Sequence, residues 1–420
     1  MKAIFLFLIN PIAGLWYALL DLNKRWHGLV FVAFYSLFGF ALSFTLTSAD
    51  SYRIAARFCQ QDYVFQNIWG MYERGTITDI YMLSVFSLVK PYTDNPKVVF
   101  AVMGAVLGGL AYLSVSQMFK IWNGKRTKYF YLILCFFVLV FSFDKVNAIR
   151  FWTATAYFSF FAIQYLYFKR RIALFLVVLS PLFHFAYMIG VVGFYLFVLL
   201  RLLRVTTNMF YFMFVIMFVG NIFMPSNMID DMMTDEEGEM EEISDNRAIG
   251  RKEQRYMRID VNQKRHDEKV KKNTTSLYSQ ANQAFTRTFG YIHKYGMFLM
   301  LSILYFNRKR TTQGEGQRMF FRFVLFSYIV GYTAQIVVFN GGRFLVLANH
   351  FYIFWFFSVF QQNCSRRWRQ YAWLLVPLNF YALSFVIFNA PRLVAPMFWV
   401  APPVLTIMDG IGFAPVDFVG

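Results

Sequence analysis

The feature that most constrains this chain is a series of long apolar runs separated by short basic clusters. Residues 98–119 and 172–200 are apolar for about 20 residues or more, enough to cross roughly 30 Å of hydrocarbon. The chain of 420 residues is 58% hydrophobic and contains 53 phenylalanines, more aromatic surface than one soluble core could bury. We therefore predict an all-α, polytopic integral membrane bundle.

The net charge of +18 has two readings, nucleic-acid binding and membrane topology. The Lys and Arg residues lie mostly in short clusters between apolar runs, which is the pattern of the positive-inside rule. We therefore expect no nucleic-acid partner. Cys59, Cys135 and Cys364 have no metal-binding or redox spacing. No metal or cofactor is expected.

Placing the basic clusters in the cytoplasm predicts about 11–13 transmembrane segments. The first is expected at residues 3–20, which puts the N-terminus outside. Residues 48–97 then form an outer loop with interfacial amphipathic helices. Three regions follow: membrane helices in residues 1–224, a large hydrophilic outer loop at residues 225–290, and further membrane helices in residues 291–420.

The segment at residues 172–200 carries basic residues at both ends, with Arg171 before it and Arg201 after it. One straight helix cannot place both ends in the cytoplasm. Pro181 lies near the middle, where it removes a helix hydrogen bond. We predict two short helices that enter the membrane and return to the same side, with His184 near the turn.

Ionisable residues at membrane depth are functional candidates because their burial costs a few kcal/mol. Arg150 is predicted to open a helix from the outside, and its planar guanidinium suits bidentate phosphate binding. An interfacial anchor or a partner for Asp144 is the alternative. His184 lies where irregular backbone usually lines a cavity, so it could act as a general base or simply be a hydrogen-bonded packing residue.

A second group of candidates lies in the outer turns. Arg343 follows the turn at residues 340–342, whose two glycines would let a ligand approach the backbone closely. His350 is seven residues further on and shares a helix face with Arg343. A salt-bridge or helix-packing role is the alternative for this pair. Asp50 and Glu73 fall in the first outer loop, where carboxylates are usually solvated.

Three short motifs form a recognisable pattern within residues 48–193. They are Asp50-Ser51-Tyr52, then Tyr72-Glu73-Arg74-Gly75, and then Asn147-Ala148-Ile149-Arg150 followed by a helix and by Leu182-Phe183-His184-Phe185. Together they resemble motifs of the EpsG family of exopolysaccharide polymerases, relatives of the Wzy O-antigen polymerases. Two positions depart from the family pattern: Arg74 replaces the usual proline, and Ala186 stands where a serine often follows the histidine.

The resemblance implies an all-helical fold related to GT-C-type glycosyltransferases in the bacterial inner membrane. It implies a substrate of oligosaccharide repeat units on undecaprenyl diphosphate, polymerised at the outer leaflet, with a flippase and a chain-length regulator as possible partners. The resemblance thus implies diphosphate binding by Arg150 and Arg343, catalysis by His184, Asp50 or Glu73, and substrate contact by Tyr52 and Asn147. His350 joins the substrate-contact residues because of its spacing from Arg343.

Two other functions fit the same sequence. An O-antigen ligase or related lipid-linked glycosyltransferase would share the outer arginines. A flippase or transporter of lipid-linked oligosaccharide would act on the same substrate without chemistry. Transporters often contain repeats with matching broken helices, and the sequence indicates one clearly broken segment. A membrane acyltransferase is a weaker possibility, because no catalytic motif accompanies His184.

Overall fold

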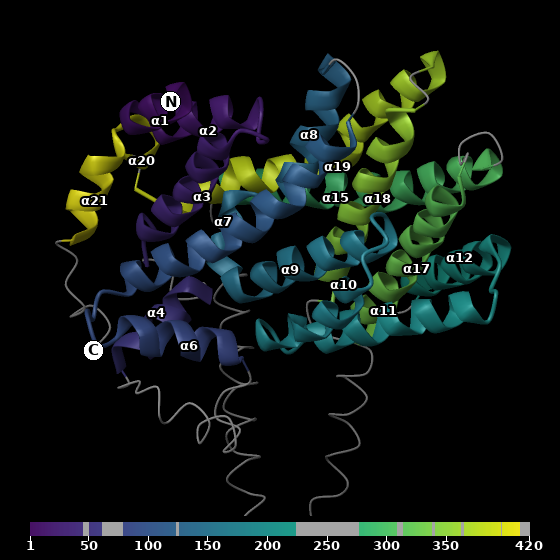
Figure 1. The fold of residues 1–420 in the computed structure, drawn as a ribbon, viewed down its shortest axis with the longest axis horizontal. Coiled ribbons are helices and arrows are strands. Elements are labelled where there is room, and N and C mark those ends of the chain that lie inside the picture. Colours follow the sequence, from purple (N-terminus) through teal and green to yellow (C-terminus); the bar gives the residue numbers. More distant parts are fainter. Residues whose placement is uncertain are drawn as a thin grey trace, which may run out of the picture.

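The structure is a computed structural model that describes residues 1–44, 50–60, 79–122, 126–223, 277–308, 314–337, 341–362, 365–395 and 397–411. These residues form a bundle of helices without a sheet, and only Leu42 and Val394 make an isolated bridge (Figure 1). The prediction of an all-α bundle is confirmed. The helices are α1 (Lys2–Ile9), α2 (Pro11–Leu19), α3 (Arg25–Phe40), α4 (Asp50–Gln60), α6 (Ile80–Val89), α7 (Pro96–Ile121), α8 (Lys128–Val140), η2 (Phe143–Ala148), α9 (Ile149–Leu166), α10 (Ile172–Leu176), η3 (Val177–Leu182), α11 (Tyr187–Leu202), α12 (Thr207–Phe223), α15 (Leu277–Phe306), α17 (Glu315–Val337), α18 (Arg343–Phe360), α19 (Arg366–Leu393), α20 (Met397–Val400) and α21 (Pro403–Ile411).

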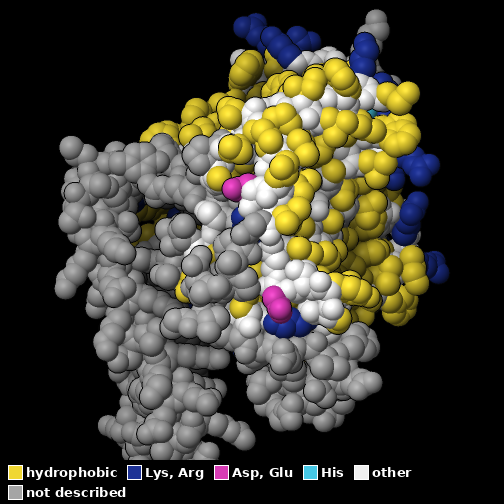
Figure 2. Space-filling view, turned by 90° about the vertical axis from the view of Figure 1, so that its left-hand side faces the viewer, with side chains coloured by type: hydrophobic (Ala, Val, Ile, Leu, Met, Phe, Trp, Pro, Cys, Tyr) yellow, Lys and Arg dark blue, Asp and Glu magenta, His cyan; other side chains and the backbone are white. Residues whose placement is uncertain are grey.

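Four helical stretches in the described part are long and apolar enough to cross a membrane, namely α7, α8 through α9, α17 and α18. Shorter apolar helices, including α11 and α12, accompany them. Figure 2 shows a broad hydrophobic face with Lys and Arg gathered along its upper and right-hand margins. The molecule is an integral membrane protein, and the count of 11–13 segments stays a prediction.

Helix α18 is the most enclosed of the four spans. The protein buries 83% of its apolar stretch of 18 residues, compared with 50% for the corresponding stretch of α7. Trp355, in the middle of α18, is fully buried and donates a 3.1 Å hydrogen bond to the carbonyl of Gln317 on α17. A helix that is covered on nearly all sides belongs to the core, so α18 is the element around which its neighbours pack.

Helices α3 and α7 pack tightly because glycines stand where their backbones meet. A Cβ atom on Gly39 would lie 2.1 Å from the carbonyl oxygen of Phe100, and one on Gly104 would lie 2.4 Å from that of Tyr35. Small residues allow membrane helices to approach in this way. The pairing of 39 with 100 and of 35 with 104 also shows that the two helices run antiparallel.

Residues 3–20 do not form the single spanning helix that the sequence analysis predicts. The chain breaks at Asn10, whose side-chain oxygen accepts hydrogen bonds from the amides of Ile12 and Ala13, both at 3.0 Å. Pro11 follows at the first position of α2, where its missing N–H costs nothing. A strong cap together with a helix-starting proline explains why the apolar run splits here.

The two pieces fold back on each other as a hairpin. Gly14 lies against the backbone of Phe7, and Ala3 shares a small buried cluster with Ala18. The helices contain 8 and 9 residues, so each is only about 12–14 Å long and cannot span the bilayer. The N-terminus therefore lies on the same side as the end of α2, so the prediction of one span at residues 3–20 is wrong, and the side on which the N-terminus lies stays a prediction.

The predicted break at Pro181 is confirmed. Pro181 lies inside the short 3-10 helix η3, and the helical path stops before α11 begins. Helix α11 then returns beside α10, since the Tyr195 hydroxyl donates a 2.7 Å hydrogen bond to the carbonyl of Leu174. His184 lies at the turn of this second hairpin, as predicted.

The long helix α15 begins at Leu277, inside the region assigned to the large outer loop. Its 30 residues extend for about 45 Å, more than the hydrocarbon thickness. The polar first half therefore carries the helix into the region that was assigned to the loop. Residues 224–276, which make up most of the predicted loop, lie outside the described part.

The C-terminal helices close the bundle against the first hairpin. The Asn10 side chain donates a 3.1 Å hydrogen bond to the carbonyl of Trp399 on α20. The Asn95 side chain donates one of 2.9 Å to the carbonyl of Gly410 on α21. Helices α20 and α21 thus lie beside the first hairpin (Figure 1).

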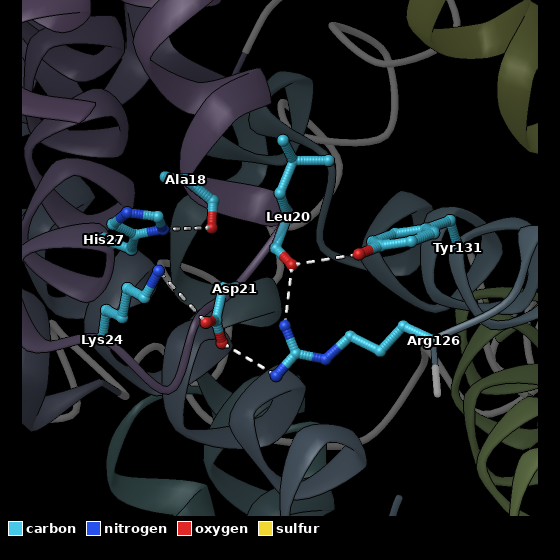
Figure 3. Close-up of polar contacts among 7 residues, drawn as sticks. All are labelled: Ala18, Leu20, Asp21, Lys24, His27, Arg126 and Tyr131. Atoms are coloured by element: carbon cyan, nitrogen blue, oxygen red, sulfur yellow. Dashed lines mark hydrogen bonds and ion pairs between the residues drawn. The ribbon is translucent and has the colours of Figure 1, made fainter. Parts of the chain in front are cut away.

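An ionic junction fixes the first hairpin at the turn between α2 and α3 (Figure 3). Asp21 pairs with Arg126 at 2.9 Å and with Lys24 at 3.5 Å. Arg126 also donates to the carbonyl of Leu20, as does the hydroxyl of Tyr131. This junction joins the α2–α3 turn to the segment that enters α8.

Candidate functional site

Asp79 connects three elements at the end of the bundle that is predicted to face outward. It directly precedes α6, where an aspartate ordinarily caps its own helix, yet its side chain makes no such cap. Its Oδ2 atom lies 2.5 Å from Nη1 of Arg150 at the start of α9, and its Oδ1 atom accepts a 3.0 Å hydrogen bond from the amide of Phe185. The Asp79 side chain is 2% exposed. Its two contacts hold the hairpin of α10, η3 and α11 against α9.

Arg150 therefore has a protein partner that the sequence analysis did not identify. The local candidate, Asp144, instead pairs with Lys145 at 3.0 Å and accepts a hydrogen bond from Ser142. The Arg150 side chain remains 26% exposed beside the ion pair with Asp79. The phosphate-binding role of Arg150 stays a prediction, but an unsatisfied charge can no longer be its reason.

His184 lies between η3 and α11, at the turn that Asp79 holds. Its Nδ1 atom accepts a 3.2 Å hydrogen bond from the amide of Ala186. In a neutral imidazole with an accepting Nδ1, the proton is on Nε2. His184 can therefore donate a hydrogen bond through Nε2 in this state, whereas a general base would need a free lone pair there. Its ring meets that of Phe151 edge to face, with centroids 5.5 Å apart.

Arg343 also lies next to the Phe151 ring. It is the first residue of α18, and its guanidinium carbon lies 5.3 Å from the centre of the Phe151 ring. The residue is half-buried, and no hydrogen bond or ion pair to another described residue is recorded for its guanidinium. Asp50 and Arg150 are its main charged neighbours. Among the described residues, the Arg343 guanidinium therefore makes no hydrogen bond or ion pair, and its donors can bind a ligand.

The glycines before Arg343 have a different explanation from the one predicted. A Cβ atom on Gly341 would lie 1.8 Å from the carbonyl oxygen of Ala334 on α17. Gly341 is therefore required for the close packing of the α17–α18 turn. The prediction that both glycines make room for a ligand is wrong for Gly341.

Helix α4 brings the first outer motif to the same place. Asp50 forms an ion pair with Arg53 and is a charged neighbour of both His184 and Arg343. The hydroxyl of Ser51 donates a 2.8 Å hydrogen bond to Oδ1 of Asn147, which ties α4 to η2. Asn147 is therefore a structural tie through its oxygen. Tyr52 is half-buried and packs against the core.

One predicted site residue, His350, is not brought into this cluster, and another falls outside the described residues. His350 is fully buried about two turns deeper in α18, where its ring stacks on Phe137 with centroids 3.9 Å apart and packs against Phe141. Neither of its ring nitrogens has a hydrogen-bond partner. It belongs to the aromatic core and not to the outer cluster. Glu73 lies outside the described residues.

Four predicted residues do converge: His184 has Asp79, Arg150, Arg343 and Asp50 as its charged neighbours. We call these five residues the outer cluster. Within the described part, no group of three or more His, Cys, Asp or Glu side chains is arranged to hold a metal ion. The cluster can bind an anion through Arg343, donate a hydrogen bond through His184 and accept a proton at Asp50.

Comparison of the chain with protein-family models, with curated proteins and with solved structures gives no match. The function must therefore be argued from the outer cluster itself.

Proposed function

We propose that this protein is a polysaccharide polymerase that joins oligosaccharide repeat units carried on undecaprenyl diphosphate at the outer leaflet of a bacterial inner membrane. The observation that carries the proposal is the half-buried Arg343, which has donors to spare and lies beside His184 and Asp50 at the outer end of a membrane bundle. The motif resemblance points to the same reaction.

The leaving group of this reaction is a lipid diphosphate, which gains negative charge as the glycosidic bond breaks. Arg343 would bind its oxygens, and a guanidinium fixed against an aromatic ring in a partly dry site stabilises such charge more than it would in water. Arg150, held by Asp79, would contribute its remaining donors from the other side.

The acceptor sugar supplies a hydroxyl that must lose its proton. Of the two carboxylates near His184, Asp50 is the better proton acceptor, because Asp79 is buried in its ion pair with Arg150. The hydroxyl proton would pass to Asp50 and the hydroxyl oxygen would bond to the anomeric carbon. The electron pair of the broken C–O bond would stay with the diphosphate. His184 would donate its Nε2 proton in a hydrogen bond to a substrate oxygen, which also fits the tautomer set by Ala186.

A small apolar cavity of about 20 Å³ has Phe344, the neighbour of Arg343 in the sequence, in its wall. It lies between α9, α11, α17 and α18, and its walls include Gly190, Gly193, Phe344 and Phe351. Phe344 directly follows Arg343, so an anionic head group at Arg343 would place the first carbons of its lipid chain toward this cavity. This arrangement supports a substrate with a lipid tail, although a lipid-linked ligase substrate would share it.

A transporter of the same lipid-linked sugar is the second candidate. The structure has two broken hairpins, α1–α2 and α10–η3–α11, where the sequence indicated one. Broken helices in corresponding positions are a mark of many transporters. The tip of the first hairpin, however, is closed by neutral contacts of Asn10. Of the two tips, only the second is held by charged side chains in the described part, which favours a single chemical site.

A deletion strain of the source bacterium separates these functions. Loss of a polymerase should leave single repeat units on the lipid carrier at the outer leaflet and abolish long polymer. Loss of a ligase should leave long polymer unattached to its final acceptor, and loss of a flippase should trap repeat units at the inner leaflet. Unchanged polymer length in the deletion strain would refute the proposed function.

A further inference from the structure

A second charged group lies at the opposite end of α9, on the cytoplasmic side. Lys169 follows α9, Arg201 is near the end of α11, and Arg318 and Arg322 are in the first two turns of α17. Lys169 has Arg201 as a charged neighbour, and Arg322 has both Arg201 and Arg318. We call these four residues the inner basic cluster.

The cluster has little counter-charge. Glu315 is the acidic neighbour of both Lys169 and Arg322, and no ion pair links any of the four cations to a described carboxylate. Four cations around one carboxylate repel one another unless an anion is present.

Topogenic cations usually extend singly into water, whereas two of these groups are held by hydrogen bonds to the protein. The ammonium of Lys169 donates to the carbonyl of Leu166 at 2.8 Å and lies 3.8 Å from the sulfur of Met319. Nε of Arg322 donates to the hydroxyl of Thr207 at 2.8 Å. Partial burial lowers the pKa of Lys169, with Arg201 acting in the same direction. The positions of the cations are therefore set by packing across three elements.

The surface next to the cluster is apolar. Ile172, Phe175, Leu199 and Leu202 are exposed on α10 and α11, directly after Lys169 and around Arg201. Exposed side chains of this kind on a membrane helix face lipid tails. A ligand that suits both features has a phosphate for the cations and acyl chains for the apolar face.

We propose that the inner basic cluster binds the phosphate of an anionic phospholipid of the cytoplasmic leaflet. Basic pockets between membrane helices on the cytoplasmic side are suited to such head groups. A bound phospholipid would hold the ends of α9, α11 and α17 together, at the opposite end of α9 from the outer cluster. The proposal does not depend on the proposed polymerase activity.

The test uses the purified full-length protein in nanodiscs of phosphatidylcholine, with or without phosphatidylglycerol. Native mass spectrometry would count the phosphatidylglycerol retained, and a thermal scan would report the melting temperature. The variant Arg201→Gln/Arg322→Gln is compared with Arg366→Gln/Arg367→Gln, which removes the same charge from exposed residues at the start of α19. The single variant Arg201→Gln preserves the bond between Arg322 and Thr207 and so guards against misfolding.

We expect phosphatidylglycerol to raise the melting temperature of the wild type and of the α19 control. Each cation removed from the inner basic cluster should weaken retention about fivefold. Equal loss in the α19 control would mean that diffuse charge attracts the lipid, which overturns the proposal. Equal stabilisation by inorganic phosphate in phosphatidylcholine nanodiscs would show that the cluster binds free phosphate, and would overturn it as well.

Discussion

The two broken hairpins resemble each other in outline and differ at their tips. Each is interrupted next to a proline, at Pro11 in the first and Pro181 in the second, and each returns to the side that it came from. At the first tip, the side-chain oxygen of Asn10 accepts hydrogen bonds from the first amides of α2, and its nitrogen donates one to the Trp399 carbonyl. The second tip is held by the charged side chain of Asp79.

The difference separates a structural break from a candidate site. Backbone groups exposed by a break at membrane depth must find partners inside the protein. A neutral asparagine does this at low cost in the first hairpin. The second hairpin uses a buried carboxylate, which in turn requires Arg150 and brings it next to His184. This arrangement is costly unless the charges have a further use.

The largest expected effect concerns the contact that distinguishes the second tip. In Asp79→Ala, Arg150 loses its counter-ion and the amide of Phe185 loses its acceptor. Breaking a buried ion pair should lower the free energy of unfolding by about 3 kcal/mol. A thermal scan of the purified protein in detergent measures this loss as a lower melting temperature. Asp79→Asn keeps an oxygen for Phe185 and should lose less. If both variants melt like the wild type, Asp79 does not hold the second tip.

His184 tests whether the second tip is functional. His184→Ala should reduce polymer formation by about a hundredfold, the effect of removing one positioned donor. Glutamine carries an N–H near the position of Nε2, so His184→Gln should retain more activity than His184→Ala if the residue donates a hydrogen bond. If His184 is a base, both variants should fail equally. Polymer length in the complemented deletion strain, normalised to protein level, measures the result.

The fold class could be predicted from the sequence because apolar runs and basic clusters report on the bilayer directly. The break at Pro181 was predictable for the same reason, since Arg171 and Arg201 both require the cytoplasmic side. The break at Pro11 was missed because no basic residue cluster precedes the first run. Asn10 followed by Pro11 favours the start of a new helix. This local preference splits an apolar run that is long enough to cross the bilayer.

The site was predictable in part. Asp50, Arg150, His184 and Arg343 were expected on the outer side, and the structure makes them neighbours. Asp79 was missed because an aspartate directly before an apolar helix has an ordinary explanation as a cap. Which partner such a side chain chooses depends on tertiary packing. The spacing of Arg343 and His350 was correct for one helix face, but seven residues along a helix separate an outer position from the aromatic core.

The two arginines of the outer cluster should respond differently to lysine. Arg343 has no recorded carboxylate contact, so Arg343→Lys loses the bidentate fork offered to a phosphate and should reduce polymer formation about tenfold. Lysine at position 150 can still pair with Asp79, so Arg150→Lys should have a smaller effect. Polymer assays in the same strain compare the two. A larger loss for Arg150→Lys would move the phosphate site to Arg150.

The first tip should affect stability and leave function unchanged. Asn10→Ala removes the cap of α2 and should lower the free energy of unfolding by about 1 kcal/mol. No effect on polymer length is expected once protein levels are equal, because no residue of the outer cluster contacts Asn10. The melting temperature and the polymer assay are measured together. Polymer loss without a change in melting temperature would show that the first hairpin also takes part in function.

The smallest expected effect lies at the cytoplasmic base of the first hairpin. Burial alone would raise the pKa of Asp21, but its ion pair with Arg126 outweighs this and lowers the pKa below the usual value of 3.8. A carboxylate with a lowered pKa in the folded state contributes stability above its unfolded pKa. That contribution is lost as the pH falls through the folded value. Between pH 5 and about pH 3, the wild type should therefore lose slightly more melting temperature than Asp21→Asn, which lacks the charge throughout. The pair is partly exposed, so the difference should be small and should shrink further at high salt.

Identical acid profiles for the two proteins would contradict this prediction. They would mean that the Asp21 ion pair adds no stability, and that the junction in Figure 3 contributes through the hydrogen bonds to the Leu20 carbonyl.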